Sequence, residues 1–339
     1  MSYALDDKTV LITGATGFLG RHLTSSLLEQ CGRLCALVRS PEKAPGRLPA
    51  AVEVYQGDMT EPTGWPDIFG ETDAVVHLAN IVDPSDGPVQ KVNVEGTRHL
   101  ARRAAEEGAE RFLYVSSVMV YGLSAPPVVT EATEFGADVN AYGRSKQEAE
   151  KLLLGMQEEG RLDPVIVEPA AIYGPYDETW TLGPLEIARD GAAILPDGGQ
   201  GRFQPMYVDD LTRGLAAALR RGRPGERYIL SGPAPVTFQE YFGQFTGMVG
   251  EGEPKSMPGW LMRSLAALLE WGAPLTGQEP ILTQEEIRYL QRQSEYRHEK
   301  ASEELGFEPE VSLEEGMQQV ERWLKEEGYL EASAAKQPS

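Results

Sequence analysis

The sequence predicts an α/β fold: a doubly wound parallel sheet followed by a smaller, mostly helical C-terminal lobe. Short apolar runs alternate with helical patterns through the first half of the 339 residues. A glycine-rich segment joins the first apolar run to the first helical pattern. After Gly174 this alternation stops, and a stretch rich in Gly, Pro and polar residues begins.

Each element of the sheet is predicted from its own pattern. Apolar runs of four or five residues indicate buried strands, and longer amphipathic stretches indicate covering helices. The predicted strands are 9–12, 34–38, 52–55, 74–78, 111–115, 164–167 and 227–230, and the predicted helices are 18–30, 89–107, 142–156 and 210–221. Because strand–helix–strand crossovers are right-handed, this order gives a Rossmann arrangement.

The domain boundaries follow the change in pattern. Residues 1–174 are expected to form the Rossmann domain, to which residues near 205–230 return with one more helix and strand. Residues 175–204 and 231–330 are expected to form a substrate-binding lobe, with no strand alternation after about Ser231. Residues 331–339 are small and polar, which predicts a disordered tail.

The composition excludes several classes of partner. With 31 basic and 52 acidic residues, the formal charge is −21, which repels nucleic acid and anionic membranes and leaves a small-molecule substrate as the expected partner. The acidity fits either solubility or a high-salt habitat. Cys31, Cys35 and four histidines do not cluster, so no metal site is expected. The N-terminus lacks a signal pattern, which indicates a cytoplasmic protein.

The glycine-rich segment has the spacing of a phosphate-binding turn. It follows a predicted strand and opens a predicted helix, which is the context that a dinucleotide fingerprint needs. One glycine permits the tight turn, one lets the backbone approach a pyrophosphate and one lets the helix lie close to the strand, while the helix N-terminus attracts the anion. The residues expected to contact the dinucleotide here are Gly14, Thr16, Gly17, Phe18, Leu19 and Gly20.

Two further segments are placed to contact the adenosine half of a dinucleotide. Arg39 follows the second predicted strand, where NAD-binding proteins carry an acidic residue, and its guanidinium can pair a 2′-phosphate. This favours NADP over NAD. Asp58 and Met59 follow the third predicted strand, where the Asp58 carboxylate could accept a hydrogen bond from the adenine amino group or could simply stabilise a turn.

The spacing Tyr142-x-x-x-Lys146 places a phenol and an ammonium on one face of a helix. A phenol with a pKa near ~10 exchanges protons poorly at neutral pH, and a neighbouring ammonium and a bound nicotinamide cation would lower that pKa. Ser116 and Ser117 end the preceding strand, so a serine hydroxyl is expected to face the same crevice. The combination predicts proton transfer coupled to hydride transfer.

Several motifs in order resemble the extended short-chain dehydrogenase/reductase superfamily, also called the NAD-dependent epimerase/dehydratase family. The motifs are the glycine segment 13–20, His77-Leu78-Ala79-Asn80, Asn93-Val94-Glu95-Gly96-Thr97, Tyr114-Val115-Ser116-Ser117, Tyr121-Gly122, Tyr142-Gly143-Arg144-Ser145-Lys146 and Pro169-Ala170-Ala171-Ile172-Tyr173-Gly174-Pro175. The C-terminal segments 280–283 and 300–309 resemble the 3β-hydroxysteroid dehydrogenase and dihydroflavonol-reductase-like branch.

The resemblance implies a role for individual residues. It implies that Ser117 is the catalytic serine, that Tyr142 is the general acid/base, and that Lys146 holds the nicotinamide ribose and tunes the tyrosine. It also places five further residues against the cofactor: Leu78, Ala79, Asn80, Pro169 and Ile172. The sequence departs from the family pattern at Glu168, where Arg is usual, at Asn80, where Ala is commoner, and at Arg202, which is one position out of register for a diphosphate-binding Arg.

Three functions stay open from the sequence. The first is an oxidoreductase that transfers hydride between NAD(P) and a secondary alcohol or ketone. The second is a nucleotide-sugar epimerase or dehydratase with tightly bound NAD, for which Glu131 and Glu134 are the available acidic pair. The third is a non-catalytic dinucleotide sensor, which the presence of all three catalytic residues disfavours. The resemblance also implies a homodimer that forms through the helices 89–107 and 142–156.

Overall fold

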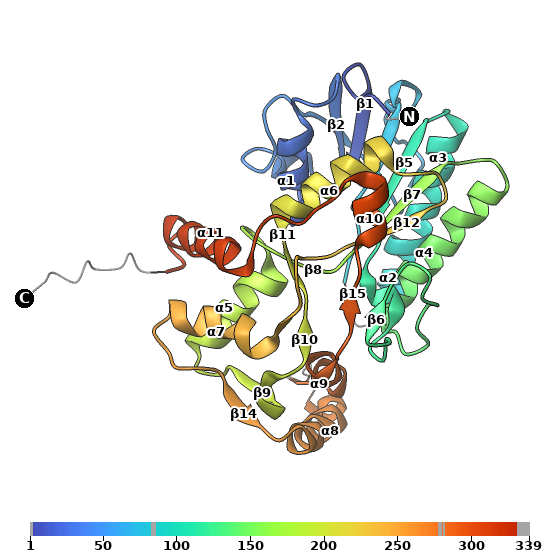
Figure 1. The fold of residues 1–339 in the computed structure, drawn as a ribbon. Coiled ribbons are helices and arrows are strands. Elements are labelled where there is room, and N and C mark those ends of the chain that lie inside the picture. Colours follow the sequence, from blue (N-terminus) through green and yellow to red (C-terminus); the bar gives the residue numbers. More distant parts are fainter. Residues whose placement is uncertain (1–2, 83–85, 277–279, 281, 331–339) are drawn as a thin grey trace, which may run out of the picture. The chain divides into compact units, whose positions relative to one another are not determined.

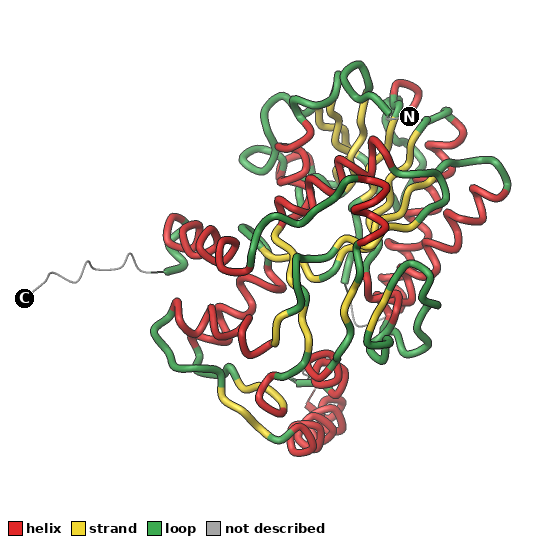
Figure 2. The backbone as a smooth tube through the Cα atoms, viewed as in Figure 1, coloured by secondary structure: helices red, strands yellow, loops and turns green. Residues whose placement is uncertain are grey.

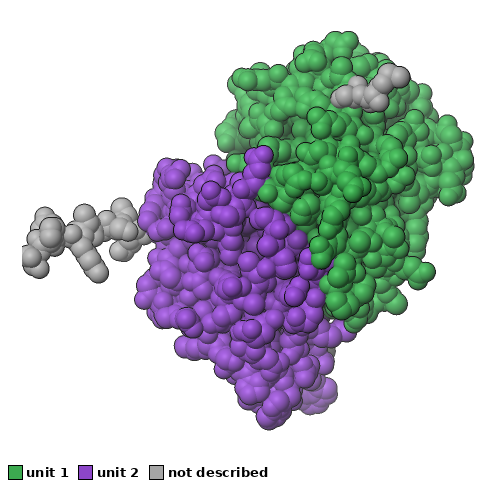
Figure 3. All heavy atoms as spheres, viewed as in Figure 1, with its two compact units in different colours: residues 1–170, 208–231, 296–309 green, residues 171–207, 232–295, 310–339 purple. Residues whose placement is uncertain are grey.

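The computed structural model describes residues 3–82, 86–276, 280 and 282–330 and contains two compact units. The first unit comprises residues 1–170, 208–231 and 296–309, and the second comprises residues 171–207, 232–295 and 310–339 (Figure 3). The predicted tail 331–339 lies outside the described residues. The first unit therefore takes up two segments from the second half of the chain.

A seven-stranded parallel sheet forms the centre of the first unit, with the strand order β12-β7-β5-β4-β1-β2-β3. Its strands are β1 (Thr9–Thr13), β2 (Arg33–Val38), β3 (Glu53–Gln56), β4 (Ala74–His77), β5 (Arg111–Val115), β7 (Pro164–Pro169) and β12 (Arg227–Leu230). The strand order reverses between β1 and β4, which is where doubly wound sheets bind their ligands. The predicted doubly wound fold is confirmed.

Helices cover the sheet on both faces, as the apolar character of its strands requires. They are α1 (Phe18–Leu27), α2 (Asp86–Val89), α3 (Thr97–Glu106), α4 (Ala141–Glu158), α6 (Val208–Arg221) and α10 (Glu299–Leu305), with 3₁₀ turns at Pro41–Lys43, Phe69–Glu71 and Val118–Tyr121 and a short strand β6 (Val128–Val129). Leu11, Val75 and Phe112 share a buried core with side chains of α3 and α4, and α1 lies beside α6 (Figures 1 and 2).

One predicted helix is interrupted in the structure. The region predicted as a continuous helix 89–107 consists of α2, a π-helical segment Gln90–Gly96 and then α3. A π-helical segment inside a helix usually marks a functional site. Here it carries Asn93, whose side chain bonds the loop after β4 and the start of α4.

The second unit combines short strands with helices. Its elements are β8 (Ala171–Tyr173), a π-helical segment Glu178–Leu182, α5 (Gly183–Arg189), β9 (Ile194–Pro196), a 3₁₀ turn Asp197–Gly199, β10 (Arg202–Phe203), β11 (Pro205–Tyr207), β13 (Val236–Thr237), α7 (Phe238–Met248), β14 (Lys255–Met257), α8 (Gly259–Thr276), α9 (Gln284–Gln291) and α11 (Leu313–Glu326), and at β15 (Glu295–Tyr296) the chain passes back to the first unit.

Short strand pairs and an aromatic core hold the second unit together, and the strand pairs differ from what the sequence predicted. β11 pairs with β8, β14 with β9 and β13 with β10, so strands occur after Ser231 although none was expected there. They are only two or three residues long, which is too short to produce an alternating pattern. The core is aromatic, and the ring of Phe203 lies 4.6 Å from that of Tyr241 and 4.8 Å from that of Phe238.

Candidate active site

The glycine turn between β1 and α1 is shaped by close backbone contacts. Gly14 has a φ of +74°, and a Cβ there would lie 2.7 Å from the backbone nitrogen of Ala79, at the end of β4. A Cβ at Gly20 would lie 2.2 Å from the carbonyl oxygen of Gly14. No other residue fits either position, because backbone atoms cannot yield as a flexible side chain does. The turn therefore lies directly against the end of β4.

The start of α1 offers the donors that a pyrophosphate needs. Gly17 is the N-cap of α1, is exposed and supplies no capping side chain, so the first amides of the helix lack a side-chain acceptor. Thr16, Phe18 and Leu19 are half-buried around it. An exposed helix N-terminus without a side-chain cap, beside a turn of obligatory glycines, fits the phosphates of a dinucleotide.

The predicted adenosine contacts lie at the ends of β2 and β3. Arg39 is exposed just after β2, and the Asp58 carboxylate accepts hydrogen bonds from the Thr60 amide and hydroxyl, both at 2.8 Å. Burial raises the pKa of Asp58, but the Thr60 bonds and the Arg39 charge outweigh it and hold that pKa below its usual value. Met59 is buried, and its side chain lies against Gly96.

A buried polar chain links the glycine turn to the helix α3. The Nδ1 atom of His77 lies 2.7 Å from the hydroxyl of Thr13, and its Nε2 lies 2.8 Å from the hydroxyl of Thr97. Burial lowers the pKa of His77 to about 3, and the charge of Lys146 adds to this effect, so the imidazole is neutral. His77 is thus a structural bridge that fixes β1, β4 and α3 relative to one another.

The loop after β4 holds the next group of predicted residues. Leu78 is buried, Ala79 is half-buried with its amide 3.4 Å from the Thr13 hydroxyl, and Asn80 is exposed and donates to the Leu78 carbonyl at 2.8 Å. Asn93 fixes the end of this loop through two bonds of 2.9 Å to the backbone of Ile81. The loop therefore has a set conformation beside the glycine turn.

Asn93 also connects this loop to α4. Its amide nitrogen donates to the Ser145 hydroxyl at 3.0 Å, and that hydroxyl donates to the Tyr142 carbonyl at 2.7 Å. Sequence reasoning gave Asn93, Ser145 and His77 no individual role. They were quoted only as parts of family motifs, which was the signal available for them.

The first turn of α4 places Tyr142 beside Ser117. Asn140 caps the helix by accepting a bond from the Gly143 amide at 2.8 Å. Gly143 allows the helix to approach the turn after β5, because a Cβ there would lie 2.8 Å from the carbonyl oxygen of Met119. Ser117 caps that 3₁₀ turn, and its hydroxyl lies within hydrogen-bonding reach of the Tyr142 phenol.

Lys146 lies one turn further along α4 and is buried. Its Nζ donates to the carbonyl oxygen of Val115 at 2.8 Å and lies 5.6 Å from the ring centre of Tyr142 and 4.9 Å from that of Tyr114. The structure thus brings Ser117, Tyr142 and Lys146 together at the carboxyl ends of β5 and its neighbours.

The electrostatics of this group differ from the expectation. Burial raises the pKa of Tyr142 to about 12, against which the Ser117 bond acts in the lowering direction. Burial also lowers the pKa of Lys146 to about 7, opposed by the charge of Glu150. The expected lowering of the tyrosine pKa, which also depends on a bound nicotinamide cation, is therefore not seen in the protein alone, because removal of the phenol from water outweighs the effect of Ser117.

The last two predicted cofactor contacts fall in different units. Pro169 is buried at the end of β7 in the first unit. Ile172 is half-buried in β8 of the second unit, where it is paired with Met206. All the other predicted site residues belong to the first unit.

Comparison with known proteins decides the family. A sequence profile of the NAD dependent epimerase/dehydratase family matches residues 10–231, which include the glycine turn and the three grouped side chains. The chain belongs to this family. The predicted membership, and with it the prediction of an enzyme, is confirmed.

Relatives match along nearly the whole chain. Sterol demethylase protein B of Methylococcus capsulatus is 28% identical over 95% of this chain and 100% of its own length. The 3-beta-hydroxysteroid dehydrogenase of Mycolicibacterium neoaurum is 26% identical over 91% of this chain and 89% of its own length. This chain is thus similar in sequence to the branch that its C-terminal segments indicated.

The fold is shared with solved structures of the same type. DesIV, a dTDP-glucose 4,6-dehydratase from Streptomyces venezuelae solved with NAD, matches with a TM-score of 0.76 at 22% identity and covers 95% of this chain and 99% of its own. In the part of the chain that the structure describes, no helix is long and apolar enough to cross a bilayer. Nor do three or more potential metal ligands gather anywhere among those residues.

Proposed function

We propose that this family member is an NAD(P)-dependent oxidoreductase that acts on a secondary alcohol or ketone. The observation that carries the proposal is the grouping of Ser117, Tyr142 and Lys146 at the same edge of the sheet as the glycine turn. The dinucleotide would be held by the turn, by the N-terminus of α1 and by Arg39. When bound, its nicotinamide supplies or accepts the hydride.

The three grouped side chains then bind the oxygen of the substrate and exchange a proton with it. Ser117 holds that oxygen by a hydrogen bond, because its hydroxyl already contacts the phenol of Tyr142. Tyr142 donates a proton to the oxygen during reduction and accepts one during oxidation. Its phenol is fully protonated at neutral pH, since its pKa is about 12, and this favours the role of acid in reduction.

Two contacts disfavour the nucleotide-sugar alternative. Glu131, one of the acidic residues available to a dehydratase, accepts the Ile229 amide at 2.8 Å and is thereby used to fix β12. Arg202, the candidate for a diphosphate contact, forms an ion pair of 3.1 Å with Glu295. Both side chains therefore already have structural partners within their own units.

Arg39 supports NADP as the preferred dinucleotide. The guanidinium is exposed after β2, at the position from which it can reach a 2′-phosphate. The cofactor bound by DesIV is NAD, but at 22% identity that likeness concerns the fold alone. The homodimer and the cytoplasmic location stay predictions, and native mass spectrometry together with fractionation of cells would test them.

The test is turnover of a panel of ketones and secondary alcohols, including sterols, with NADPH and NADH or their oxidised forms. Wild-type protein should consume added dinucleotide in proportion to product, and Tyr142→Phe should lower kcat by about 10²- to 10⁴-fold. The same variant should bind the dinucleotide with unchanged affinity in a fluorescence titration. Tightly retained NAD with no net change of dinucleotide during turnover would instead establish an epimerase or dehydratase.

A further inference from the structure

Two glutamates are buried side by side behind the catalytic group. Glu150 lies four residues after Lys146 on α4, so both project from one side of the helix. Glu168 lies on β7, at the position where the family usually has Arg. Both side chains are completely buried, with 0% exposure, and their carboxyl groups are within hydrogen-bonding reach of each other.

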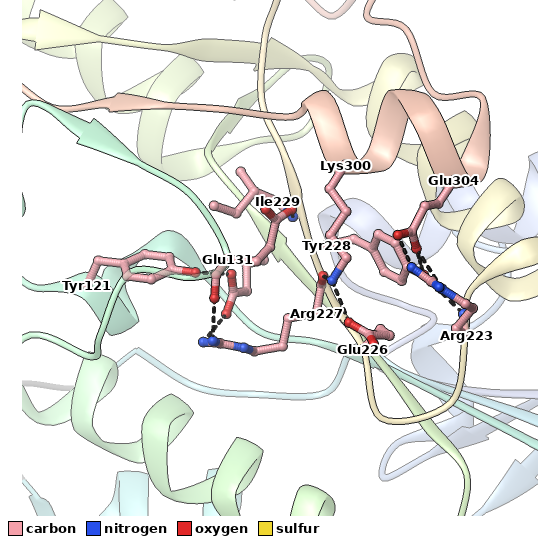
Figure 4. Close-up of polar contacts among 10 residues, drawn as sticks. Tyr121, Glu131, Arg223, Glu226, Arg227, Tyr228, Ile229, Lys300 and Glu304 are labelled. Atoms are coloured by element: carbon pink, nitrogen blue, oxygen red, sulfur yellow. Dashed lines mark hydrogen bonds and ion pairs between the residues drawn. The ribbon is translucent and has the colours of Figure 1, made fainter.

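The two carboxyl groups have unequal surroundings. Glu168 accepts a hydrogen bond from the Tyr121 hydroxyl at 2.5 Å and pairs with the Arg227 guanidinium at 3.4 Å. Figure 4 shows Tyr121 and Arg227, which come from different elements, pointing toward one another. Glu150 accepts a bond from the Ser116 hydroxyl at Oε1, and its buried Oε2 faces no donor among the described residues unless one carboxyl group is protonated.

Charge balance then sets the number of protons on the pair. A buried carboxylate is tolerated only with a cation or several donors, and the cation beside this pair, Arg227, is paired with Glu168. One negative charge is therefore balanced, and the second carboxyl group must hold a proton. Burial first, and then the charge of Glu168, raise the pKa of Glu150 well above its usual range. Burial also raises the pKa of Glu168, but the Arg227 charge and the Tyr121 hydrogen bond oppose that rise.

We propose that Glu168 keeps Glu150 protonated. Lys146 then has no charged carboxylate from Glu150, its neighbour one turn along α4. Glu168 is then a positioning residue that acts on the charge of Lys146 through Glu150. The proton on Glu150 completes a hydrogen bond from its Oε2 to Glu168, which satisfies the otherwise unpaired oxygen.

Few other charged and titratable groups lie around the pair and Lys146. Tyr114 and Val115 on β5 face Lys146, and His77 on β4 is neutral. Glu131 accepts the Ile229 amide, and its backbone carbonyl accepts a bond from Arg227. Within this described group, Glu150 is the carboxyl group whose ionisation would raise the pKa of Lys146.

The first test is the pH profile of kcat/KM, and it rests on the proposed function. Deprotonation of the Lys146 ammonium should make kcat/KM fall at high pH, and this fall is the alkaline limb of the profile. Glu168→Gln leaves Arg227 with Glu150 as its buried partner, so Glu150 ionises and the limb should move up by about one pH unit. Glu150→Gln removes no charge and should leave the limb where it is. The double variant should match Glu150→Gln.

A second test needs no substrate. Protonated carboxyl groups have an infrared C=O band that ionised ones lack, and exposed carboxyl groups are ionised at about pH 8. Wild-type protein should show one such band at this pH, and Glu150→Gln and Glu168→Gln should both lose it. The double variant Glu168→Gln/Arg227→Gln should keep the band, because it removes the Glu168 carboxylate together with its cation and leaves Glu150 protonated. It also controls for misfolding, since a band lost through misfolding of Glu168→Gln would not return in the double variant.

The outcomes separate the two proposals. Absence of the band in wild-type protein, or its persistence in Glu168→Gln, overturns the shared proton. A limb shift that persists in the Glu150→Gln background shows that Glu168 does not act through Glu150. If no substrate is turned over at all, the proposed function fails, and the infrared measurement still decides whether the proton is present.

Discussion

Replacement of Gly143 by alanine tests whether the close approach of α4 to the turn after β5 is what assembles the site. The added Cβ would lie 2.8 Å from the carbonyl oxygen of Met119 and 3.1 Å from the Cβ of Val139. The first neighbour is backbone, so the helix must move rather than a side chain. Relief to an ordinary contact of about 3.4 Å requires a shift of roughly 0.6 Å in the first turn of α4.

That shift acts directly on the reacting groups. Tyr142 precedes the substituted residue, and its partner Ser117 lies on the element from which the helix would be pushed. A displacement of about 1 Å can cost about 10²-fold in rate, so Gly143→Ala should lower kcat/KM by about 10- to 100-fold. Overpacking should also lower the free energy of unfolding by about 1–3 kcal/mol.

The assay is steady-state kinetics on the substrate that wild-type protein turns over, together with urea unfolding. Gly155 supplies a matched control in the same helix, because a Cβ there meets nothing within 4 Å. Gly155→Ala should keep full activity and stabilise the protein by about 0.5–1 kcal/mol. Wild-type activity in Gly143→Ala with an unchanged unfolding midpoint would refute the reasoning.

Three further changes have defined outcomes. Because burial lowers the pKa of Lys146 to about 7 while the unfolded lysine titrates near ~10.4, wild-type stability should rise with pH between these values. Lys146→Met should lack that rise, and parallel unfolding curves against pH would contradict the low pKa. Arg39→Ser should raise KM for NADPH about tenfold or more with little effect on NADH, and equal effects would argue against a 2′-phosphate contact. Asn140→Ala should cost about 1 kcal/mol as a lost helix cap, measured by thermal unfolding, and no loss would mean the cap is dispensable.

The sheet and the three grouped side chains could be predicted because each depends on a local pattern. Buried parallel strands are apolar on both faces, so runs such as 9–12 are visible in the sequence. Tyr142 and Lys146 share a helix, and their spacing alone places them on one face. A serine hydroxyl at this edge follows from the strand end at Ser116 and Ser117, since parallel strands end at the same edge, and the family resemblance selects Ser117.

Features that depend on contacts between distant segments could not be predicted. The π-helical segment around Asn93 leaves no periodic signature, yet its side chain ties the loop after β4 to α4. The short pairings in the second unit, such as β9 with β14, join residues about sixty positions apart. The raised pKa of Tyr142 likewise depends on how much of the phenol the fold removes from water.

The consequence of Glu168, a departure from the family pattern, depends on the residues that surround it in the fold. The sequence shows a carboxylate where the family pattern usually has a guanidinium. In the structure a guanidinium lies beside this carboxylate, because Arg227 pairs with Glu168 from the neighbouring strand β12. That guanidinium balances the charge of Glu168, and we propose that the buried carboxyl group of Glu150 therefore holds a proton. Since Glu150 shares a helix with Lys146, the residue at position 168 can change the charge of Lys146 although Glu168 itself is not one of the three grouped side chains.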